Sequence, residues 1–245
     1  MSQWVFDLGN TRLKCAQLDE EGHLRGISAL GHDAGDFVDA LRAHLPDDAA
    51  SACLASVASP EVTAAVIEVL TERFQRISLA RTQARLGGLH IAYRHAEKLG
   101  VDRFLALLAA HARGGDWLIV GVGTAVTVDL LADRGRHLGG RIAASPTLMR
   151  QALHHAARQL AETGGEYVEF ADDTEDALVS GCEGAALGLI ERSLREATAR
   201  TGVVPRIVLH GGGAAALAPR LADASYAPAL VLEGLASWAR LGHPA

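Results

Sequence analysis

Aromatic side chains are scarce in this sequence. They make up 4% of its 245 residues, whereas apolar residues together make up 49%. The core must therefore be built mainly from Ala, Leu and Val, and aromatic platforms for single-stranded nucleic acid are not expected. The formal net charge of −6 gives no overall attraction for a polyanion. Both features argue against a nucleic-acid partner.

Long apolar runs and paired cysteines are also missing. No stretch approaches the ~18 apolar residues of a membrane span, and residues 1–20 lack the regions of a signal peptide. The cysteines, Cys15, Cys53 and Cys182, are scattered without the CxxC spacing of a redox or zinc site. We therefore expect reduced thiols, a cytoplasmic location and no membrane partner.

Short β-rich runs alternate with helical spacing along the chain, which predicts an α/β fold. Strands are expected at residues 4–7, 13–18, 53–57, 77–79, 118–122, 125–131 and 206–209. Helices are expected at residues 33–45, 60–74, 101–113, 147–162, 175–200 and 229–241.

The two halves of the chain begin alike. Residues 5–11 can be laid on residues 119–125, which matches Gly9 with Gly123, and each segment reads as strand, glycine turn, strand. This duplication indicates two α/β halves with a cleft between them. No Pro- or Ser-rich linker separates them, so we place the boundary in Gly114-Gly115-Asp116 and expect domains of residues 1–115 and 116–245.

The first glycine turn, Asp7-Leu8-Gly9-Asn10-Thr11, has the chemistry of a phosphate loop. Its Gly-Asn pair favours a hairpin turn because both residues tolerate positive φ, and a tight turn exposes backbone N–H groups to a phosphate. Lys14 adds a cation for phosphate oxygens, and Asp7 could hold Mg²⁺ directly or through water. An ordinary hairpin turn is the alternative for this segment alone.

Two more glycine segments follow strands in the second half. Gly123-Thr124 occupies the place equivalent to the first turn, and both turns together could hold the β- and γ-phosphates of ATP. Gly211-Gly212-Gly213 precedes an Ala-rich helix and would let the backbone pass close to an adenine ring. Helix-start packing would explain the glycine triplet equally well, so the combination carries more weight than any one segment.

A third cluster, Leu99-Gly100-Val101-Asp102-Arg103, opens a helix. Asp102 suits the positive end of the helix dipole, whereas Arg103 is mildly unfavourable there and indicates an anionic ligand. Asp102 could accept the proton of a hydroxyl that attacks the γ-phosphate. Helix capping explains Asp102 as well as catalysis does.

At these residues the sequence resembles type III pantothenate kinase over nearly its full length. Residues 7–11 match the family's D-x-G-N-[ST] loop. Tyr93 and residues 100–103 match a tyrosine seven residues before a G-x-D-R motif. Gly123-Thr124-Ala125, followed by Thr127 and Asp129, matches part of a D-x-G-T-A loop.

Two segments of the second half extend the resemblance. Gly139-Gly140-Arg141-Ile142 matches a Gly-Gly-x-Ile segment, and residues 174–181 match Thr-x-x-Ala-[Leu/Ile]-x-x-Gly. In this order and spacing the motifs are specific for the family.

The resemblance implies an α/β protein of two ribonuclease-H-like halves, with mixed sheets flanked by helices, in the acetate-kinase, sugar-kinase and actin superfamily. It implies a homodimer that binds ATP, Mg²⁺ and pantothenate, with Asp102 as general base and the substrate pocket at the dimer interface. The implied ATP-binding residues are Asp7, Leu8, Gly9, Asn10, Thr11, Arg12, Leu13, Lys14 and Thr124. The implied pantothenate-binding residues are Tyr93, Gly100, Val101, Asp102, Arg103 and Thr174.

The sequence departs from the family pattern at two places. The aspartate that usually begins the second loop and binds a monovalent cation is Gly121 here. The x-Pro-Gly that usually follows Gly-Gly-x-Ile is Ala143-Ala144-Ser145. We therefore expect a weaker dependence on K⁺ or NH₄⁺ than the family implies, with Arg141 or Lys98 as the substitute positive charge.

These observations together predict an ATP-dependent pantothenate kinase that makes 4′-phosphopantothenate for coenzyme A biosynthesis. Two alternatives stay open at this point. One is a kinase of the same superfamily that acts on a sugar or small acid, since Tyr93 and Thr174 are tied to pantothenate only by resemblance. The other is a nucleotide-binding regulator with weakened catalysis, for which Gly121 is the hint and which intact Asp7, Asp102 and Arg103 oppose.

Overall fold

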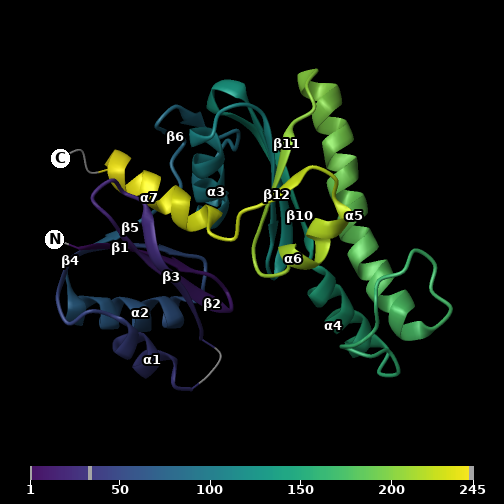
Figure 1. Ribbon diagram of the computed structural model, residues 1–245, viewed down its shortest axis with the longest axis horizontal. Helices are drawn as coiled ribbons and strands as arrows, with labels where there is room; N and C mark the ends of the chain where they lie inside the picture. Colours follow the sequence, from purple (N-terminus) through teal and green to yellow (C-terminus); the bar gives the residue numbers. More distant parts are fainter. Residues whose placement is uncertain (1, 33–34, 243–245) are drawn as a thin grey trace. The chain divides into compact units, whose positions relative to one another are not determined.

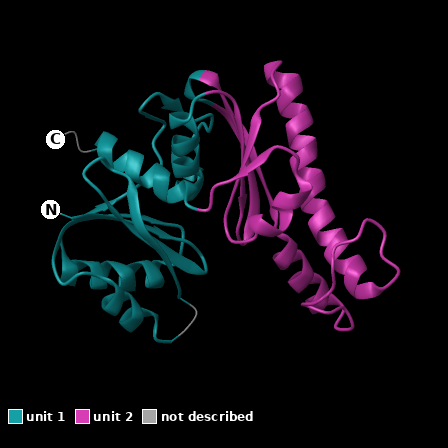
Figure 2. Ribbon diagram, in the orientation of Figure 1, with its two compact units in different colours: residues 1–114, 134–136, 229–245 teal, residues 115–133, 137–228 magenta. Residues whose placement is uncertain are grey.

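The computed structural model describes residues 2–32 and 35–242, which form two compact units (Figures 1 and 2). Unit 1 consists of residues 1–114, 134–136 and 229–245, and unit 2 of residues 115–133 and 137–228. Within the described ranges, no helix is both long and apolar enough to cross a bilayer.

Unit 1 is built on a five-stranded mixed sheet in the order β3-β2-β1-β4-β5. The strands are β1 (Gln3–Leu8), β2 (Arg12–Leu18), β3 (Leu24–Gly31), β4 (Ala49–Ser56) and β5 (Phe74–Leu79). β1, β2 and β3 form an antiparallel meander, whereas β1, β4 and β5 run parallel to one another. The parallel connection from β4 to β5 is made by helix α2 (Pro60–Arg73), as crossover connections require.

Helices cover both faces of this sheet. α1 (Phe37–His44) and α2 pack on one face through a cluster that includes Phe6, Leu41 and Leu70. On the opposite side of the sheet, α7 (Leu230–Gly242) contacts β1 and β2 and packs along α3 (Val101–Ala112) (Figure 1). The helix expected at residues 33–45 corresponds to α1, and its residues 33–34 lie outside the described part of the chain.

The contact between α3 and α7 depends on Gly234. A Cβ atom at this position would overlap the carbonyl group of Leu105, so the two helix backbones touch without an intervening side chain. Because of this contact the last helix belongs to unit 1, whereas the expected division at residue 115 assigns it to the C-terminal half. The boundary expected at residue 115 lies within one residue of the first break between units, after Gly114. The sequence did not indicate that the chain returns to unit 1 at residue 229.

Unit 2 repeats the strand order of unit 1. Its strands run in the order β12-β11-β8-β9-β10, where β8 is antiparallel to β9 and parallel to β11. The strands are β8 (Trp117–Val122), β9 (Ala125–Ala132), β10 (Arg136–Ala144), β11 (Arg206–His210) and β12 (Ala224–Tyr226). β8 therefore corresponds to β1, and the hairpin β8–β9 corresponds to β1–β2.

The long helix α5 (Thr174–Thr201) packs on β8 and β9 of unit 2 through residues such as Leu187 and Ile190. Asp173 caps its start, since the Oδ1 atom accepts hydrogen bonds from the N–H groups of Glu175 and Asp176. Gly202, with φ 76°, ends the helix in the left-handed conformation. α4 (Pro146–Ala156) and the short α6 (Ala214–Leu217) complete the unit.

Short elements join these parts. β6 (Arg85–Leu86) and β7 (Leu89–His90) form a small hairpin in unit 1, where Arg136 pairs with His90. The 3₁₀ helices are η1 (Ala96–Lys98), η2 (Asp133–Gly135) and η3 (Ala218–Arg220).

The expected helices and strands are all found, although several of their bounds differ. The helix expected at residues 147–162 ends at Ala156. The short strands β6, β7 and β12 were not foreseen, and neither were the longer strands β3 and β10. The sequences of β3 and β10 contain Gly and charged residues in place of the long apolar or strictly alternating run that identifies a strand.

Candidate active site

The first glycine turn joins β1 to β2 at the centre of the unit 1 sheet. The N–H group of Gly9 donates to the carbonyl oxygen of Arg12 at 3.0 Å, which leaves Asn10 and Thr11 to make the turn. Neither Gly9 nor Asn10 has a positive φ, so the conformation that the Gly-Asn pair favours is not the one adopted. The hydrogen bond from the Gly9 N–H to Arg12 closes the turn without a residue in the left-handed conformation.

His32 holds this turn from the adjacent strand end. Its Nε2–H donates to the carbonyl oxygen of Gly9 at 2.9 Å, and its backbone N–H donates to that of Thr11 at 3.2 Å. The Gly9 N–H is itself used within the turn, so the donors offered to a phosphate lie in the exposed Asn10–Thr11 segment. Sequence reasoning missed His32, because it is distant from the motif in the chain and carries no motif of its own.

Three charged side chains meet beside this turn. Asp7 and Lys14 face each other in register on β1 and β2. Burial raises the pKa of the Asp7 carboxyl from 3.8 to about 7; the ammonium of Lys14 opposes this shift and the Asp102 carboxylate adds to it. Asp7, Lys14 and Asp102 therefore lie close enough to interact electrostatically, all within unit 1.

Asp102 owes its position to the start of α3. It is the second residue of the helix, and Gly100 directly precedes the helix. A Cβ atom at position 100 would lie 2.5 Å from Oδ1 of Asp102, so the carboxylate occupies space that only glycine leaves open. This is the physical reason for glycine two residues before the aspartate in the Gly100–Arg103 motif.

Arg103 is buried at the start of α3, with 5% of its surface exposed. Its Nη1 donates to the hydroxyl oxygen of Tyr93 at 3.2 Å, and its guanidinium carbon lies 5.7 Å from the centre of the Tyr93 ring. The structure thus joins two of the expected substrate-binding residues in a single contact. A buried guanidinium at the positive end of a helix is unfavourable unless an anion or further hydrogen bonds compensate it.

The two glycine segments of unit 2 lie against each other. The Gly123 N–H donates to the carbonyl oxygen of Ala125 at 2.9 Å, which closes a turn one residue shorter than the first, and Thr124 is exposed at the tip. The Gly213 N–H donates to the carbonyl oxygen of Val122 at 3.0 Å. Gly211, with φ 94°, has no room for a Cβ atom because the same carbonyl group fills that space.

Gly121, two residues before Gly123, is enclosed by the strands on either side. In the sheet it lies between Thr127 of β9 and His210 of β11. A Cβ atom at position 121 would lie 2.7 Å from Oγ1 of Thr127 and 2.9 Å from Nε2 of His210. His210 is the second residue that sequence reasoning missed; its position directly before Gly211-Gly212-Gly213 was the available signal.

Thr174, expected to contact pantothenate, is the first residue of α5 and is exposed. Thr174 and Thr124 belong to unit 2, whereas Tyr93, Gly100, Val101, Asp102 and Arg103 belong to unit 1.

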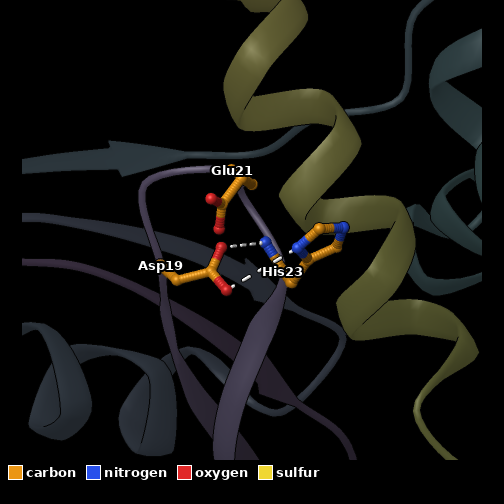
Figure 3. Close-up of side chains that lie close together, drawn as sticks. All are labelled: Asp19, Glu21 and His23. Atoms are coloured by element: carbon orange, nitrogen blue, oxygen red, sulfur yellow. Dashed lines mark hydrogen bonds and ion pairs between the residues drawn. The ribbon is translucent and has the colours of Figure 1, made fainter.

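Among the described residues of unit 1, two groups of carboxylates are candidates for a metal ion. Asp19, Glu21 and His23 gather on the β2–β3 turn (Figure 3). This group lies at the opposite end of β2 from Lys14, and Asp19 already binds Arg25 at 2.8 Å, so a cation there would have to displace the guanidinium. Asp7 and the nearby Asp102 are better candidates for Mg²⁺. A divalent cation would offset the burial and the carboxylate repulsion that raise the pKa of Asp7, and so would favour its ionised form.

Solved structures with this fold cover almost the whole chain. A putative Baf family transcriptional activator from Campylobacter jejuni matches with a TM-score of 0.64 at 18% identity, over 96% of both chains. A putative 2-dehydro-3-deoxygalactonokinase from Sinorhizobium meliloti matches with 0.63 at 15%, over 99% of this chain and 100% of the other. An archaeal actin homologue matches with 0.53 at 10%, over 98% and 99%. The fold is therefore the two-unit α/β fold of actin-like ATPases, as expected.

Sequence relatives are much closer. The chain is 54% identical to the type III pantothenate kinase of Xylella fastidiosa (strain M23) over 239 residues, and 53% identical to that of Stenotrophomonas maltophilia (strain R551-3) over 240 residues. Each alignment covers 98% of both proteins. The family model for type III pantothenate kinase matches residues 4–196. With the glycine turns and the charged cluster of unit 1, these matches show that the chain belongs to the type III pantothenate kinase family.

Proposed function

We propose that this chain transfers the γ-phosphate of ATP to the primary hydroxyl of pantothenate, which gives 4′-phosphopantothenate for coenzyme A biosynthesis. Membership of the family makes it an ATP-dependent pantothenate kinase that uses a divalent metal. The observation that supports the assignment of the reaction to particular residues is the meeting of Asp7, Lys14 and Asp102 beside the first glycine turn.

Asp102 is the general base of this proposal. Phosphoryl transfer requires an attacking hydroxyl that loses its proton and a γ-phosphate held in line with it. Asp102 lies at the open start of α3, where Gly100 leaves its carboxylate uncovered by a side chain. Asp102 also lies close enough to Asp7 for its carboxylate to contribute to the raised pKa of Asp7.

The residues from Asp7 to Lys14, with Thr124, hold ATP. Donors of the exposed Asn10–Thr11 segment and the ammonium of Lys14 bind phosphate oxygens, and charged donors form the stronger hydrogen bonds. Asp7 would hold Mg²⁺ through water, and the ion would supply neutralisation of the phosphate charge. Ionisation of Asp7 then accompanies nucleotide binding.

Tyr93, Thr174 and the segment Gly100–Arg103 bind pantothenate. Arg103 supplies the cation for the substrate carboxylate, and Tyr93 orients the guanidinium through the 3.2 Å hydrogen bond. The buried position of Arg103 strengthens such a pair, because little water competes for the carboxylate.

The active form is a homodimer that forms through unit 2. α4 has an apolar side but no buried residue, and it is followed by the loop that leads to Thr174 (Figure 1). Exposed apolar side chains gather on these segments and the adjacent strand end: Ile142, Leu148, Leu153, Val168 and Phe170. A second copy is the proposed occupant, since apolar surface beside a substrate residue marks an interaction site.

The dimer is tested by light scattering on the wild-type chain and on Phe170→Asp. Phe170 is 99% exposed, so the substitution should leave the fold intact and shift the population from dimer to monomer. A wild-type monomer at all concentrations that support turnover would disprove this part of the proposal.

The reaction is tested by ATP consumption against a panel of pantothenate, common sugars and acetate. Turnover with pantothenate alone is expected, and preference for a sugar or acetate would favour the other superfamily kinases. ATP binding without turnover on any member would favour the regulator. A cytoplasmic location, where ATP and reduced thiols are available, is part of the proposal; Cys15, Cys53 and Cys182 are buried and free.

A further inference from the structure

Gly121 lies in the middle strand of unit 2, where glycine is an unfavourable residue. Glycine in a strand interior loses backbone entropy and contributes no packing, and it often marks the close approach of another group. Here that group is the side chain of His210, which is 9% exposed and comes from the neighbouring strand β11. The ring lies over the position that a side chain at residue 121 would occupy.

A monovalent cation does not fit this place. Potassium is held by several oxygen ligands at once, from carbonyl groups, hydroxyls or carboxylates. The nearest atoms to a Cβ at position 121 are Oγ1 of Thr127 at 2.7 Å and Nε2 and Cε1 of His210 at 2.9 and 3.0 Å. An aspartate would therefore collide with the imidazole before its carboxylate could reach an ion.

The acidic residue on the same face of β9 is already engaged. Asp129, two residues beyond Thr127, is bound through Oδ1 to Nε2 of His137 at 3.0 Å, and both side chains are almost fully buried. Arg141, one of the two residues expected to substitute for the cation, binds Oγ of Ser193 at 2.8 Å and is not among the atoms nearest to position 121.

We infer that this kinase holds no monovalent cation at its second glycine turn, and that the imidazole of His210 takes the place of the ion as a positioning group. His210 is the last residue of β11 and directly precedes the glycine segment whose Gly213 N–H binds Val122. His210 therefore adjoins one glycine segment along the chain, and its ring lies beside Gly121, two residues before the other segment. This inference rests on the proposed function of these segments.

The cation requirement is measured first, on the wild-type protein. The value of kcat/KM for ATP in potassium, ammonium, sodium and choline chloride at equal ionic strength should agree within about twofold. The thermal unfolding midpoint of the protein without ATP should also be the same in these salts. A tenfold or greater stimulation by K⁺ or NH₄⁺, or a specific rise of the midpoint in either salt, would overturn the inference.

The role of the ring is separated from simple space filling by two substitutions of His210. His210→Leu keeps bulk without a polar group, and His210→Asn keeps an N–H donor. We expect His210→Leu to raise the KM for ATP about tenfold with a smaller change in kcat, and His210→Asn to retain more of the affinity. Equal KM values for wild type and His210→Leu would show that the ring only fills space and does not position ATP.

A gain-of-function pair completes the test. Gly121→Asp alone should lower the thermal midpoint, because the new side chain meets His210. Gly121→Asp combined with His210→Ala removes the collision and should acquire a K⁺-dependent rise in midpoint and in activity. If the double variant unfolds, the wild-type salt comparison still decides the question. Failure of the wild type to phosphorylate pantothenate would contradict the proposed function, whereas the salt dependence of the midpoint tests the cation site independently.

Discussion

The two units use one strand order to build two different turns. In unit 1 the middle strand carries Asp7, with Lys14 on one neighbouring strand and Ala55 on the other. Ala55 is small and buried, so the carboxyl has room to stand above the sheet. The charged group of this turn therefore comes from the middle strand.

In unit 2 the corresponding trio is Gly121, Thr127 and His210. The middle strand contributes no side chain, and the polar ring reaches over it from the outer strand. The same backbone thus supports a carboxyl in one half and an imidazole in the other. The comparison teaches that the free space beside the middle strand, rather than the turn itself, decides which ion or ligand each half can hold.

Asp102→Asn should cause the greatest loss of activity and show that chemistry resides in unit 1. We expect kcat to fall on the order of 10²–10⁴, the usual contribution of a general base, while the circular dichroism spectrum is unchanged. Gly121→Ala, in the other unit, serves as the comparison and should change kcat much less. Near-normal turnover by Asp102→Asn would show that this carboxylate does not accept the proton.

The Asp7 carboxyl makes the stability of unit 1 depend on pH, whereas Gly121, at the corresponding position of unit 2, has no side chain that titrates. The folded-state pKa of Asp7 is about 7, above the value of 3.8 for an unperturbed carboxyl. Between these pH values the unfolded chain binds fewer protons than the folded chain, so stability falls as the pH rises and levels off above about 7. The full loss is on the order of 4 kcal/mol.

Urea unfolding of the protein without nucleotide, at several pH values, measures this effect. Asp7→Asn should be as stable as the wild type near pH 4 and more stable at pH 8, although it should lose activity. Parallel pH profiles for the two proteins would mean that Asp7 is ionised in the folded state.

Gly121→Ala adds a single methyl group to the middle strand of unit 2, and we expect it to destabilise that unit. The Cβ atom of Gly121→Ala would meet Thr127 and His210 at less than van der Waals distance, so we expect a loss of about 1–3 kcal/mol in the free energy of unfolding. The matched control is Gly184→Ala in α5, where no atom lies within 4 Å of the new Cβ. This control should gain roughly 0.5–1 kcal/mol, since alanine favours helix. Equal effects of the two substitutions would show that the space at Gly121 is not restrictive.

Tyr93→Phe should have a modest effect, confined to unit 1. It removes the hydroxyl that accepts the 3.2 Å hydrogen bond from Arg103 but keeps the ring beside the guanidinium. Loss of a net 0.5–1.5 kcal/mol corresponds to a rise of about two- to tenfold in the KM for pantothenate. The KM for ATP serves as the internal control, and a larger change there would contradict the assignment of Tyr93 to the pantothenate side.

The sequence was sufficient for the fold and for the charged cluster. Both hairpins follow from β-rich runs around a glycine, and the motif residues Asp7, Lys14 and Asp102 do converge in unit 1. These residues could be predicted because each belongs to a short segment whose spacing has a local physical cause.

His32, His210 and the placement of the last helix could not be predicted in this way. Each depends on a contact between segments far apart in the chain, such as Nε2 of His32 with the carbonyl of Gly9, or Gly234 of α7 with Leu105 of α3. A single histidine or glycine carries no spacing pattern, so its partner becomes evident only from the packed structure.

The return of α7 to unit 1 has a consequence for the order in which the protein can fold. A ribosome completes residues 1–114 long before residues 229–242, yet both are needed to cover the first sheet. Until residues 230–242 have been synthesised, the face formed by β1, β2 and α3 lacks its covering helix and exposes apolar surface. Unit 1 therefore cannot complete its packing before α7 is made, and a chain that stops before residue 229 would leave this unit without part of its core.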